Sequence, residues 1–283
     1  MRRKLALLAA LASVLALGTS AANAITYGQV DTANRYDFVG LVGFYSSSGA
    51  YMWRCTGTLL SPTVLLTAGH CTSGTSSARV WFGVGPIVNG NYPFSPVSTR
   101  PPCAGYTGFP CTGEDATGTP YAHPGFDDFA TFPNTSDTGI VVLDAPVSAS
   151  AYGTLAPVGF LNSYASKKGQ QSRLFTQVGY GLQEVKPVFS ADRTRYFASS
   201  PLVNVNSANT GGWNVQFGNN PGDGNSIGGG TCSGDSGGPA FFGDSNVVVA
   251  VTSFGMNNNC KGADFSYRVD TTWAQGFITG FLP

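Results

Sequence analysis

The sequence predicts an all-β protein, with its strands arranged as barrels or as a sandwich. Its 283 residues include only two Glu and five Lys, both good helix formers, whereas Val, Thr, Phe, Tyr and Ser are abundant. Short apolar runs alternate with clusters of Gly, Asn, Pro and Ser, which is typical of strands separated by turns. The predicted strands are 38–45, 51–60, 63–66, 79–84, 139–143, 174–180, 213–217, 239–242, 247–254 and 265–269.

One helix is predicted at the carboxyl end of the sequence. Trp273, Phe277 and Phe281 recur at a spacing of four residues, which places them on one face of a helix over about 271–282. Asp270, Thr271 or Thr272 could cap its first turn. The apolar stripe is expected to dock on the core of the protein.

The first 24 residues have the pattern of a secretory signal. Met1-Arg2-Arg3-Lys4 is followed by the apolar run 5–17 and then by the small-residue site Ala22-Asn23-Ala24. The run is too short to span a membrane. We therefore expect cleavage after Ala24. The mature chain, residues 25–283, is expected to be secreted and extracellular and to contain no membrane-spanning segment.

The charges and cysteines exclude several classes of function. Charged residues make up 11% of the chain and sum to zero, so nothing favours a nucleic-acid partner. Six cysteines in an exported chain indicate disulfides, and 15 pairings are open. Their spacing matches no zinc motif, so we expect neither a metal nor another cofactor.

Two motifs carry nucleophilic chemistry. The sequence has two histidines: His70 ends an apolar strand and precedes Cys71, whereas His123 is expected to be structural. Ser236 lies between glycines in Gly234-Asp235-Ser236-Gly237-Gly238-Pro239. A similar motif forms the nucleophile elbow of α/β-hydrolases, but there the histidine follows the serine, and here both histidines precede it. That fold is excluded.

Four ordered motifs resemble the chymotrypsin/trypsin-type serine peptidase family. They are Cys55-Thr56-Gly57-Thr58-Leu59-Leu60, Thr67-Ala68-Gly69-His70-Cys71, Asp137-Thr138-Gly139-Ile140-Val141-Val142-Leu143 and 234–239. The resemblance covers essentially all of 25–283 and implies two six-stranded antiparallel β-barrels with a C-terminal helix. The first barrel would span about 25–150 and the second about 155–270, with the active site between them.

The resemblance assigns His70 as general base, Asp137 as the carboxylate that orients it and Ser236 as the nucleophile. This division suits the chemistry, because a serine hydroxyl needs a base to take its proton and a buried carboxylate fixes the tautomer of the imidazole. From composition alone, 13 Asp and two Glu compete for the carboxylate position. The backbone amides of Gly234 and Ser236 would form the oxyanion hole.

The resemblance also implies the disulfides and an activation step. It pairs Cys55 with Cys71 and Cys232 with Cys260, which leaves Cys103 with Cys111. In the family a freed isoleucine α-amino group forms a buried ion pair with the aspartate before the nucleophile. Here these residues would be Ile25, directly after the signal site, and Asp235, so signal cleavage would itself activate the enzyme.

The substrate-binding residues follow from the same resemblance. Ser253, Phe254 and Gly255 would form the strand that pairs with the substrate backbone, with Phe254 in place of the usual Trp. Ser253 could also form a hydrogen bond with Asp137.

The specificity pocket is the least regular part of the resemblance. Gly230, with Thr231 beside it, would lie at the base of this pocket, where trypsin-like members carry an aspartate. Asp264 would point either into the pocket, favouring Arg or Lys, or away from it, leaving an apolar pocket for Phe, Tyr or Leu. We expect the apolar pocket.

The sequence therefore predicts a secreted serine endopeptidase that works through an acyl-enzyme. An esterase on the same fold and a catalytically silent, protease-like binding protein are the alternatives. The expected partner is a protein or peptide substrate, without nucleic acid or membrane, and the chain is expected to be a monomer.

Overall fold

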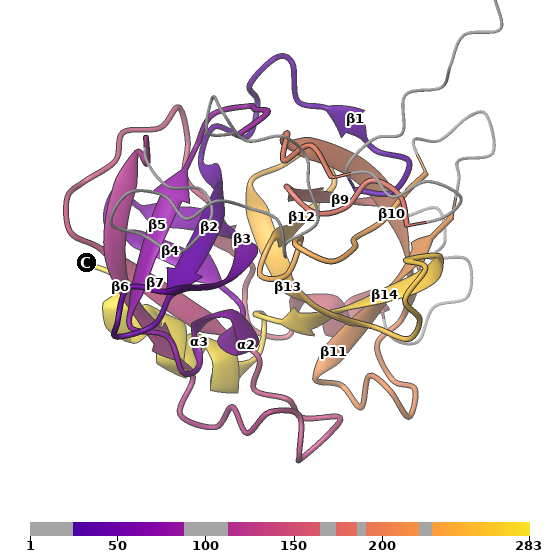
Figure 1. The fold of residues 1–283 in the computed structure, drawn as a ribbon. Coiled ribbons are helices and arrows are strands. Elements are labelled where there is room, and N and C mark those ends of the chain that lie inside the picture. The colour runs from indigo at the N-terminus through magenta and orange to yellow at the C-terminus, as the bar shows by residue number, and fades with distance from the viewer. Residues whose placement is uncertain (1–24, 88–112, 165–173, 186–190, 221–227) are drawn as a thin grey trace, which may run out of the picture.

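The computed structural model describes residues 25–87, 113–164, 174–185, 191–220 and 228–283, and it shows two closed, six-stranded antiparallel β-barrels side by side (Figure 1). The predicted fold class is therefore confirmed. No helix among the described residues is long and apolar enough to cross a membrane.

The first barrel contains the strands from residue 39 to residue 143. Its closed order is β2-β3-β4-β7-β6-β5, and β2 and β4 are buried along their whole length, as their apolar sequences require. The strands are β2 (Val39–Tyr45), β3 (Tyr51–Ser61), β4 (Val64–Thr67), β5 (Ser77–Trp81), β6 (Ala116–Ala122) and β7 (Gly139–Leu143).

The second barrel has the order β9-β10-β11-β14-β13-β12, closed by the pairing of β9 with both β10 and β12. Its strands are β9 (Leu174–Gly179), β10 (Tyr196–Asn204), β11 (Asn214–Asn219), β12 (Pro239–Phe242), β13 (Val247–Gly255) and β14 (Gly262–Arg268). Two short strands extend it: β1 (Gln29–Val30) pairs with β10, and β8 (Thr154–Leu155) pairs with β13.

Four strands were not among those predicted. β1 and β8 have two residues each, too few to show a pattern. β6 contains Gly118 and Pro120, and β10 contains Pro201, residues that usually indicate turns. The register of β6 against β7 nevertheless places Pro120 opposite Val141. Pairing between distant segments thus overrides the local preference of these residues.

The helix α3 (Thr272–Ile278) lies where it was predicted and ends in the 3₁₀ turn η4 (Thr279–Phe281). Thr271 is the cap, because its side chain accepts a hydrogen bond from the amide of Ala274. The docking face differs from the prediction: Ala274 and Ile278 are fully buried, whereas Trp273 is 49% exposed. α3 packs on the first barrel (Figure 1).

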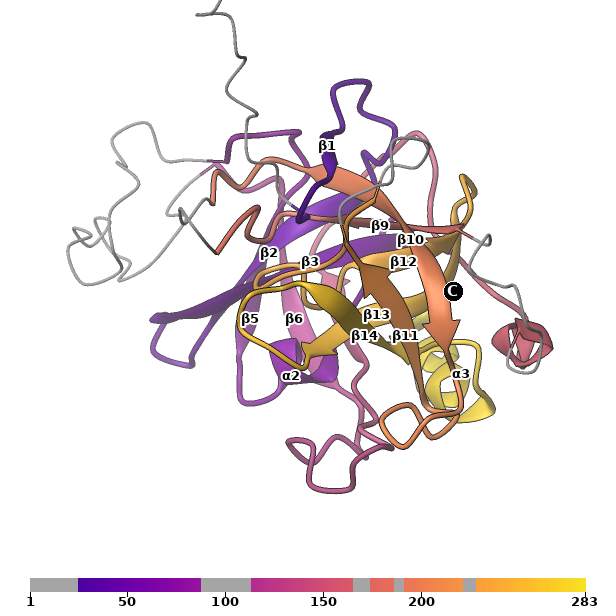
Figure 2. The same ribbon diagram turned by 90° about the vertical axis from the view of Figure 1, so that its right-hand side faces the viewer.

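The buried side chain of Arg195 links the two barrels. Arg195, before β10, donates to the Asp31 carboxylate at 2.9 Å, and both side chains are fully buried. The same guanidinium donates to the carbonyl oxygens of Val39 and Phe82 beside the first barrel. The Asp31 carboxylate compensates the buried charge, so Arg195 joins the barrels without being an unpaired cation. The second view shows the two barrels turned by 90° (Figure 2).

Candidate active site

Strand pairing brings His70 and Asp137 together. His70 lies in the short helix α2 (Gly69–Thr72), directly after β4, and Asp137 lies two residues before β7. β4 pairs with β7, with Thr67 opposite Gly139. His70 Nδ1 lies 2.9 Å from Asp137 Oδ2, and the backbone amide of His70 donates to Asp137 Oδ1 at 2.7 Å. The carboxylate thus holds both the ring and the backbone of His70.

The Cys55–Cys71 disulfide fixes α2 against β3, as the family resemblance implied. Cys232–Cys260 is the second disulfide of the described residues, and Cys103 and Cys111 lie outside them. Cys55, His70 and Cys71 form the one group of potential metal ligands in the described part of the chain. Their thiols are consumed by the disulfide, so this group cannot supply a thiolate to a metal.

The opposite charges of His70 and Asp137 shift the pKa of both residues. Burial alone would lower the pKa of His70, but the Asp137 carboxylate and its hydrogen bond, with the charge of Asp128, raise it above its usual value. Burial would raise the pKa of Asp137, but His70 and the hydrogen bonds from His70 and Ser253 lower it. The geometry therefore favours an ionised Asp137 beside an imidazole that readily accepts a proton.

Ser253 is the third group on this carboxylate. Its hydroxyl donates to Asp137 Oδ2 at 2.5 Å, and the side chain is buried in β13, the strand that also carries Phe254 and Gly255. This is the hydrogen bond that the sequence suggested for Ser253. It links β13 of the second barrel to the His70–Asp137 pair of the first.

The turn that carries Ser236 packs against the first barrel. The carbonyl oxygen of Ser236 accepts from the amide of Thr56 in β3 at 2.8 Å. A Cβ atom on Gly237 would lie 2.6 Å from the amide nitrogen of Ala68, two residues before His70, so only glycine permits this approach. No hydrogen bond joins the Ser236 hydroxyl to His70 among the described residues. In unliganded enzymes such a bond often tightens only when substrate binds.

Two backbone donors of the same turn have no acceptor among the residues that the structure describes. The amides of Asp235, Gly237 and Gly238 each donate to a backbone carbonyl. Within the described part of the chain, the amides of Gly234 and Ser236 donate to none. Gly234 has a φ of 98°, and its carbonyl oxygen accepts from a threonine hydroxyl of β3, so the turn is held in place. Two fixed, free amides beside a serine form a site suited to an oxyanion.

A cavity of about 410 Å³ opens beside Ser236. Its lining includes residues 231, 253, 254, 255 and 264, which the sequence analysis assigned to substrate binding, and both cysteines of the second disulfide. Gly230 is not among the lining residues but lies against Asp264.

Asp264 lines this cavity and is only 3% exposed. The outward orientation, on which the expected apolar pocket depended, is therefore wrong. The segment from Cys260 to Arg268 is shorter than in typical members of the family that the sequence resembles, and this shortening obscured the register in the sequence. Pairing of Asp264 with Gly255 on one side and Phe217 on the other fixes it.

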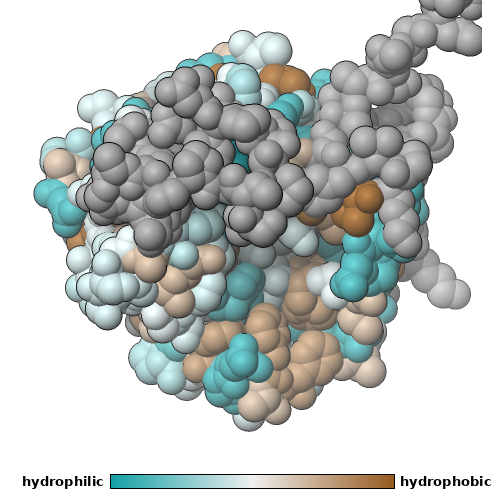
Figure 3. Space-filling model, in the orientation of Figure 1, coloured by the Kyte–Doolittle hydropathy of each residue, from teal (hydrophilic) through white to brown (hydrophobic). Residues whose placement is uncertain are grey.

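Aromatic rings next to the cavity were not predicted from the sequence, apart from Phe254. Phe254 stacks on Phe265, with ring centroids 4.8 Å apart, and contacts Phe132 at 5.5 Å and Phe129 at 6.2 Å. Phe129 in turn lies 6.0 Å from His70. Figure 3 shows moderately hydrophobic surface, coloured light brown, at the lower front of the molecule. The signal in the sequence was the Phe-rich run 126–132, which no local periodicity connected to the site.

Ile25 and Asp235 are both fully buried. Thr26 forms a β-bridge with Gly230, and its hydroxyl donates to the Gly230 carbonyl at 3.0 Å, so the first described residues run beside the segment that leads to Asp235. Asp235 accepts from the amides of Gly181 and Cys232 at 2.7 and 2.9 Å.

The burial of Asp235 changes the pKa of its carboxyl group. Burial raises its pKa to about 7, and the two backbone hydrogen bonds and the charge of Arg54 oppose the shift. Among the described residues, Asp235 forms no ion pair. A cation brought into contact with this carboxyl would favour its ionised form and lower its pKa.

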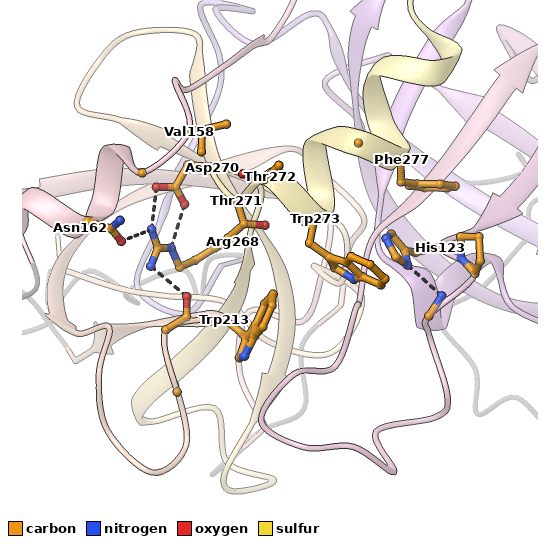
Figure 4. Close-up of a pocket in the computed structure, with 16 residues that line it drawn as sticks. His123, Val158, Asn162, Trp213, Arg268, Asp270, Thr271, Thr272, Trp273 and Phe277 are labelled. Carbon is orange, nitrogen blue, oxygen red and sulfur yellow. Dashed lines mark hydrogen bonds and ion pairs between the residues drawn. The ribbon is translucent and has the colours of Figure 1, made fainter.

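His123 has a structural role, as expected. Its ring is enclosed by Trp273 and Phe277, at centroid distances of 5.1 and 5.0 Å, and its Nδ1 accepts from the amide of Gly125 (Figure 4). Burial lowers its pKa. It borders a cavity of about 1140 Å³ whose charged lining residues, Arg268 and Asp270, pair with each other. None of the candidate active-site residues lines this larger cavity.

The two barrels, with the site at their junction, define a protein of the chymotrypsin fold. The sequence model of the trypsin family matches residues 28–99 and 116–274, and the chain belongs to this family. A comparison with curated proteins found no match.

Solved structures support the same fold. HL collagenase is 16% identical, with a TM-score of 0.63, and the match covers 91% of this chain and 99% of the collagenase. Human heparin binding protein is 17% identical, with a TM-score of 0.57 and coverage of 91% and 96%. At these identities, the likeness concerns the fold alone.

Proposed function

We propose that this protein is a secreted serine endopeptidase in which Ser236 forms an acyl-enzyme. The observation that carries the proposal is the position of the His70–Asp137 pair beside the turn of Ser236, in which two amides have no acceptor among the described residues. Membership of the trypsin family supports it. The signal pattern of residues 1–24 supports export, although those residues lie outside the described part of the chain.

In the proposed mechanism, the Ser236 hydroxyl attacks the carbonyl carbon of the scissile bond while His70 Nε2 takes its proton. Asp137 stabilises the imidazolium through Nδ1. The negative oxygen of the tetrahedral intermediate accepts from the Gly234 and Ser236 amides. Collapse breaks the C–N bond, and His70 gives the proton to the leaving amine. Water, deprotonated by His70, then releases the acyl group and restores the serine hydroxyl.

We also propose that the freed α-amino group of Ile25 pairs with Asp235. The buried position of Ile25 and the lack of an ion-pair partner at Asp235 among the described residues support this pairing. The ion pair would hold the Gly234 and Ser236 amides in their binding orientation. Cleavage of the signal after Ala24 would supply the amino group, so export and activation would be one event.

The two alternatives differ from this proposal in measurable ways. An esterase would use the same groups but would leave peptide bonds intact. A silent binding protein would lack turnover altogether. Human heparin binding protein is named for a polyanion ligand. This chain has equal numbers of basic and acidic residues, 15 each, so its composition gives no support to a polyanion site.

The test is a cleavage profile of secreted, processed protein on a mixed peptide library, with matched ester substrates in parallel. We expect internal peptide bonds to be cut, and Ser236→Ala to abolish cutting. Ser47→Ala, an exposed serine in the turn before β3, is the matched control and should retain full activity. Ester cleavage without peptide cleavage would favour the esterase, and cleavage that persists in Ser236→Ala would refute the assignment.

A further inference from the structure

The cavity of about 1140 Å³ that His123 borders takes no part in the proposed mechanism. Its walls come from α3, from the segment before β11 and from the 3₁₀ turn η2 (Phe160–Tyr164) (Figure 4). Ordinary small-molecule sites have volumes of about 300–1,000 Å³. This cavity is larger, so it has room for several residues of an extended peptide.

Aromatic rings form the apolar part of this cavity. Trp213, directly before β11, is partly buried, and Trp273 of α3 is 49% exposed. The Trp273 ring is held in place, because its Nε1 donates to Ser136 Oγ at 3.0 Å and its face packs on His123. Phe277 follows one turn later on the same side of α3. The rings of a ligand can therefore pack on aromatic surfaces that are already fixed.

The charged groups of the cavity neutralise each other. Arg268 and Asp270 form an ion pair at 2.8 Å, and both side chains are buried. Arg268 also donates to Asn162 Oδ1 and to the carbonyl oxygen of Gly212, and Asp270 accepts from the amide of Leu161. A charged ligand would lose hydration here without gaining a counter-charge, so the cavity favours a neutral ligand.

The polar side-chain atoms that remain for a ligand are mainly donors. In the part of the chain that the structure describes, neither Asn162 Nδ2 nor Trp213 Nε1 donates to an acceptor. The Thr271 hydroxyl accepts from the amide of Ala274 and keeps its proton to donate, whereas the Thr272 hydroxyl can serve either role. A matching ligand therefore brings acceptor oxygens.

We propose that this cavity binds a neutral, proline-rich peptide segment in the polyproline II conformation. The pyrrolidine rings would pack on the indoles, and each proline brings a carbonyl acceptor without an N–H group. The conformation has no internal hydrogen bonds, so its carbonyl oxygens are available to Trp213 Nε1 and Asn162 Nδ2. Aromatic-lined grooves bind such segments in other proteins, and the segment is already ordered before it binds.

A neutral oligosaccharide could also pack on indole rings, but it matches the cavity less well. Each sugar hydroxyl is a donor as well as an acceptor. The side-chain acceptors at this site, Asn162 Oδ1 and the Asp270 carboxylate, are already bonded to Arg268. The hydroxyl protons of a sugar would therefore find few side-chain partners here.

The test measures binding to processed, full-length Ser236→Ala. This variant lacks the proposed nucleophile, so the result does not depend on whether the protein is a peptidase. The probe is a ten-residue proline peptide with blocked ends, and the comparison ligands are a Gly-Ser peptide of the same length and maltohexaose. Calorimetry measures the affinities, and tryptophan fluorescence reports on the indoles. We expect both comparison ligands to bind at least about tenfold more weakly than the proline peptide.

Two substitutions remove the donors, each in the Ser236→Ala background. Asn162→Asp keeps the oxygen that accepts from Arg268 and loses the amide donor, at an exposed position. It should weaken proline-peptide binding about tenfold. Trp213→Phe keeps a ring but loses Nε1 and should weaken binding about 2- to 10-fold. Phe132→Ala, at an exposed ring beside Phe254, is the matched control and should leave the affinity unchanged.

The proposal fails if the proline peptide does not bind, if the Gly-Ser peptide binds equally well, or if maltohexaose is preferred. It also fails if the affinity is insensitive to Asn162→Asp and Trp213→Phe. A loss confined to Phe132→Ala would place the peptide beside the candidate active site instead. Thermal unfolding of each variant separates a lost contact from a lost fold.

Discussion

Replacement of Ser236 or His70 by alanine is expected to lower kcat by about 10⁶-fold, with the double variant little worse than either single variant. The two side chains act in one proton transfer, so removing either one stops the same step. Asp137→Asn should lower kcat by about 10⁴-fold, because an amide cannot hold the productive tautomer of His70. Steady-state kinetics on one peptide substrate measure all four variants.

The pH dependence of wild-type activity also tests the role of His70 as the base. Protonated His70 cannot act as base, and its raised pKa means that activity appears only as the pH rises through a value above the usual 6.5. His123→Gln is the matched control, since the His123 ring packs against Trp273 and Phe277 and borders the other cavity, and its pKa is lowered. Additive losses in the double variant, or an unchanged pH profile in Asp137→Asn, would contradict a shared role for these residues.

Asp235→Asn is expected to lower kcat/KM by about 10²- to 10⁴-fold while the fold persists. The substitution removes the proposed partner of the Ile25 α-amino group and leaves that group buried without a counter-charge, a loss of about 3–5 kcal/mol. One extra residue between Ala24 and Ile25 should have a similar effect, because the amino group would no longer reach Asp235. Activity and far-UV circular dichroism, measured on the same samples, separate loss of the ion pair from loss of the fold.

The control for this prediction is Asp244→Asn, which changes an exposed acid and should leave activity intact. N-terminal sequencing of the secreted protein must accompany the assay. A mature start well downstream of Ile25 would refute the activation step, and so would full activity of the extended chain.

The arrangement of the barrels could be predicted from the sequence because four motifs occur in a fixed order. Gly139–Leu143 and Pro239–Phe242 were predicted with their observed bounds, since each is a short apolar run between turn residues. β6 and β10 were missed because Gly118, Pro120 and Pro201 lower the local preference for a strand. Their pairing is a property of the closed barrel and is not visible in a local window.

In the candidate site, too, some residues could be predicted from the sequence and others could not. His70, Asp137 and Ser236 stand in recognisable motifs, so the sequence located them as candidates. The orientation of Asp264 depended on the register of β14, which a shortened segment concealed. Phe129 reaches the vicinity of His70 through a loop in which both it and the preceding aspartate have positive φ, a backbone course that composition does not reveal.

Reaction of the processed protein with a fluorophosphonate, followed by peptide mapping with mass spectrometry, tests whether Ser236 is the nucleophile that His70 activates. The reagent bonds covalently to a serine whose proton has been removed by a neighbouring base. We expect one adduct per molecule, on Ser236, at about pH 8, where His70 is deprotonated. The adduct should be lost in His70→Ala. An adduct on another residue, or labelling of Ser236 that is as fast without His70, would contradict this assignment.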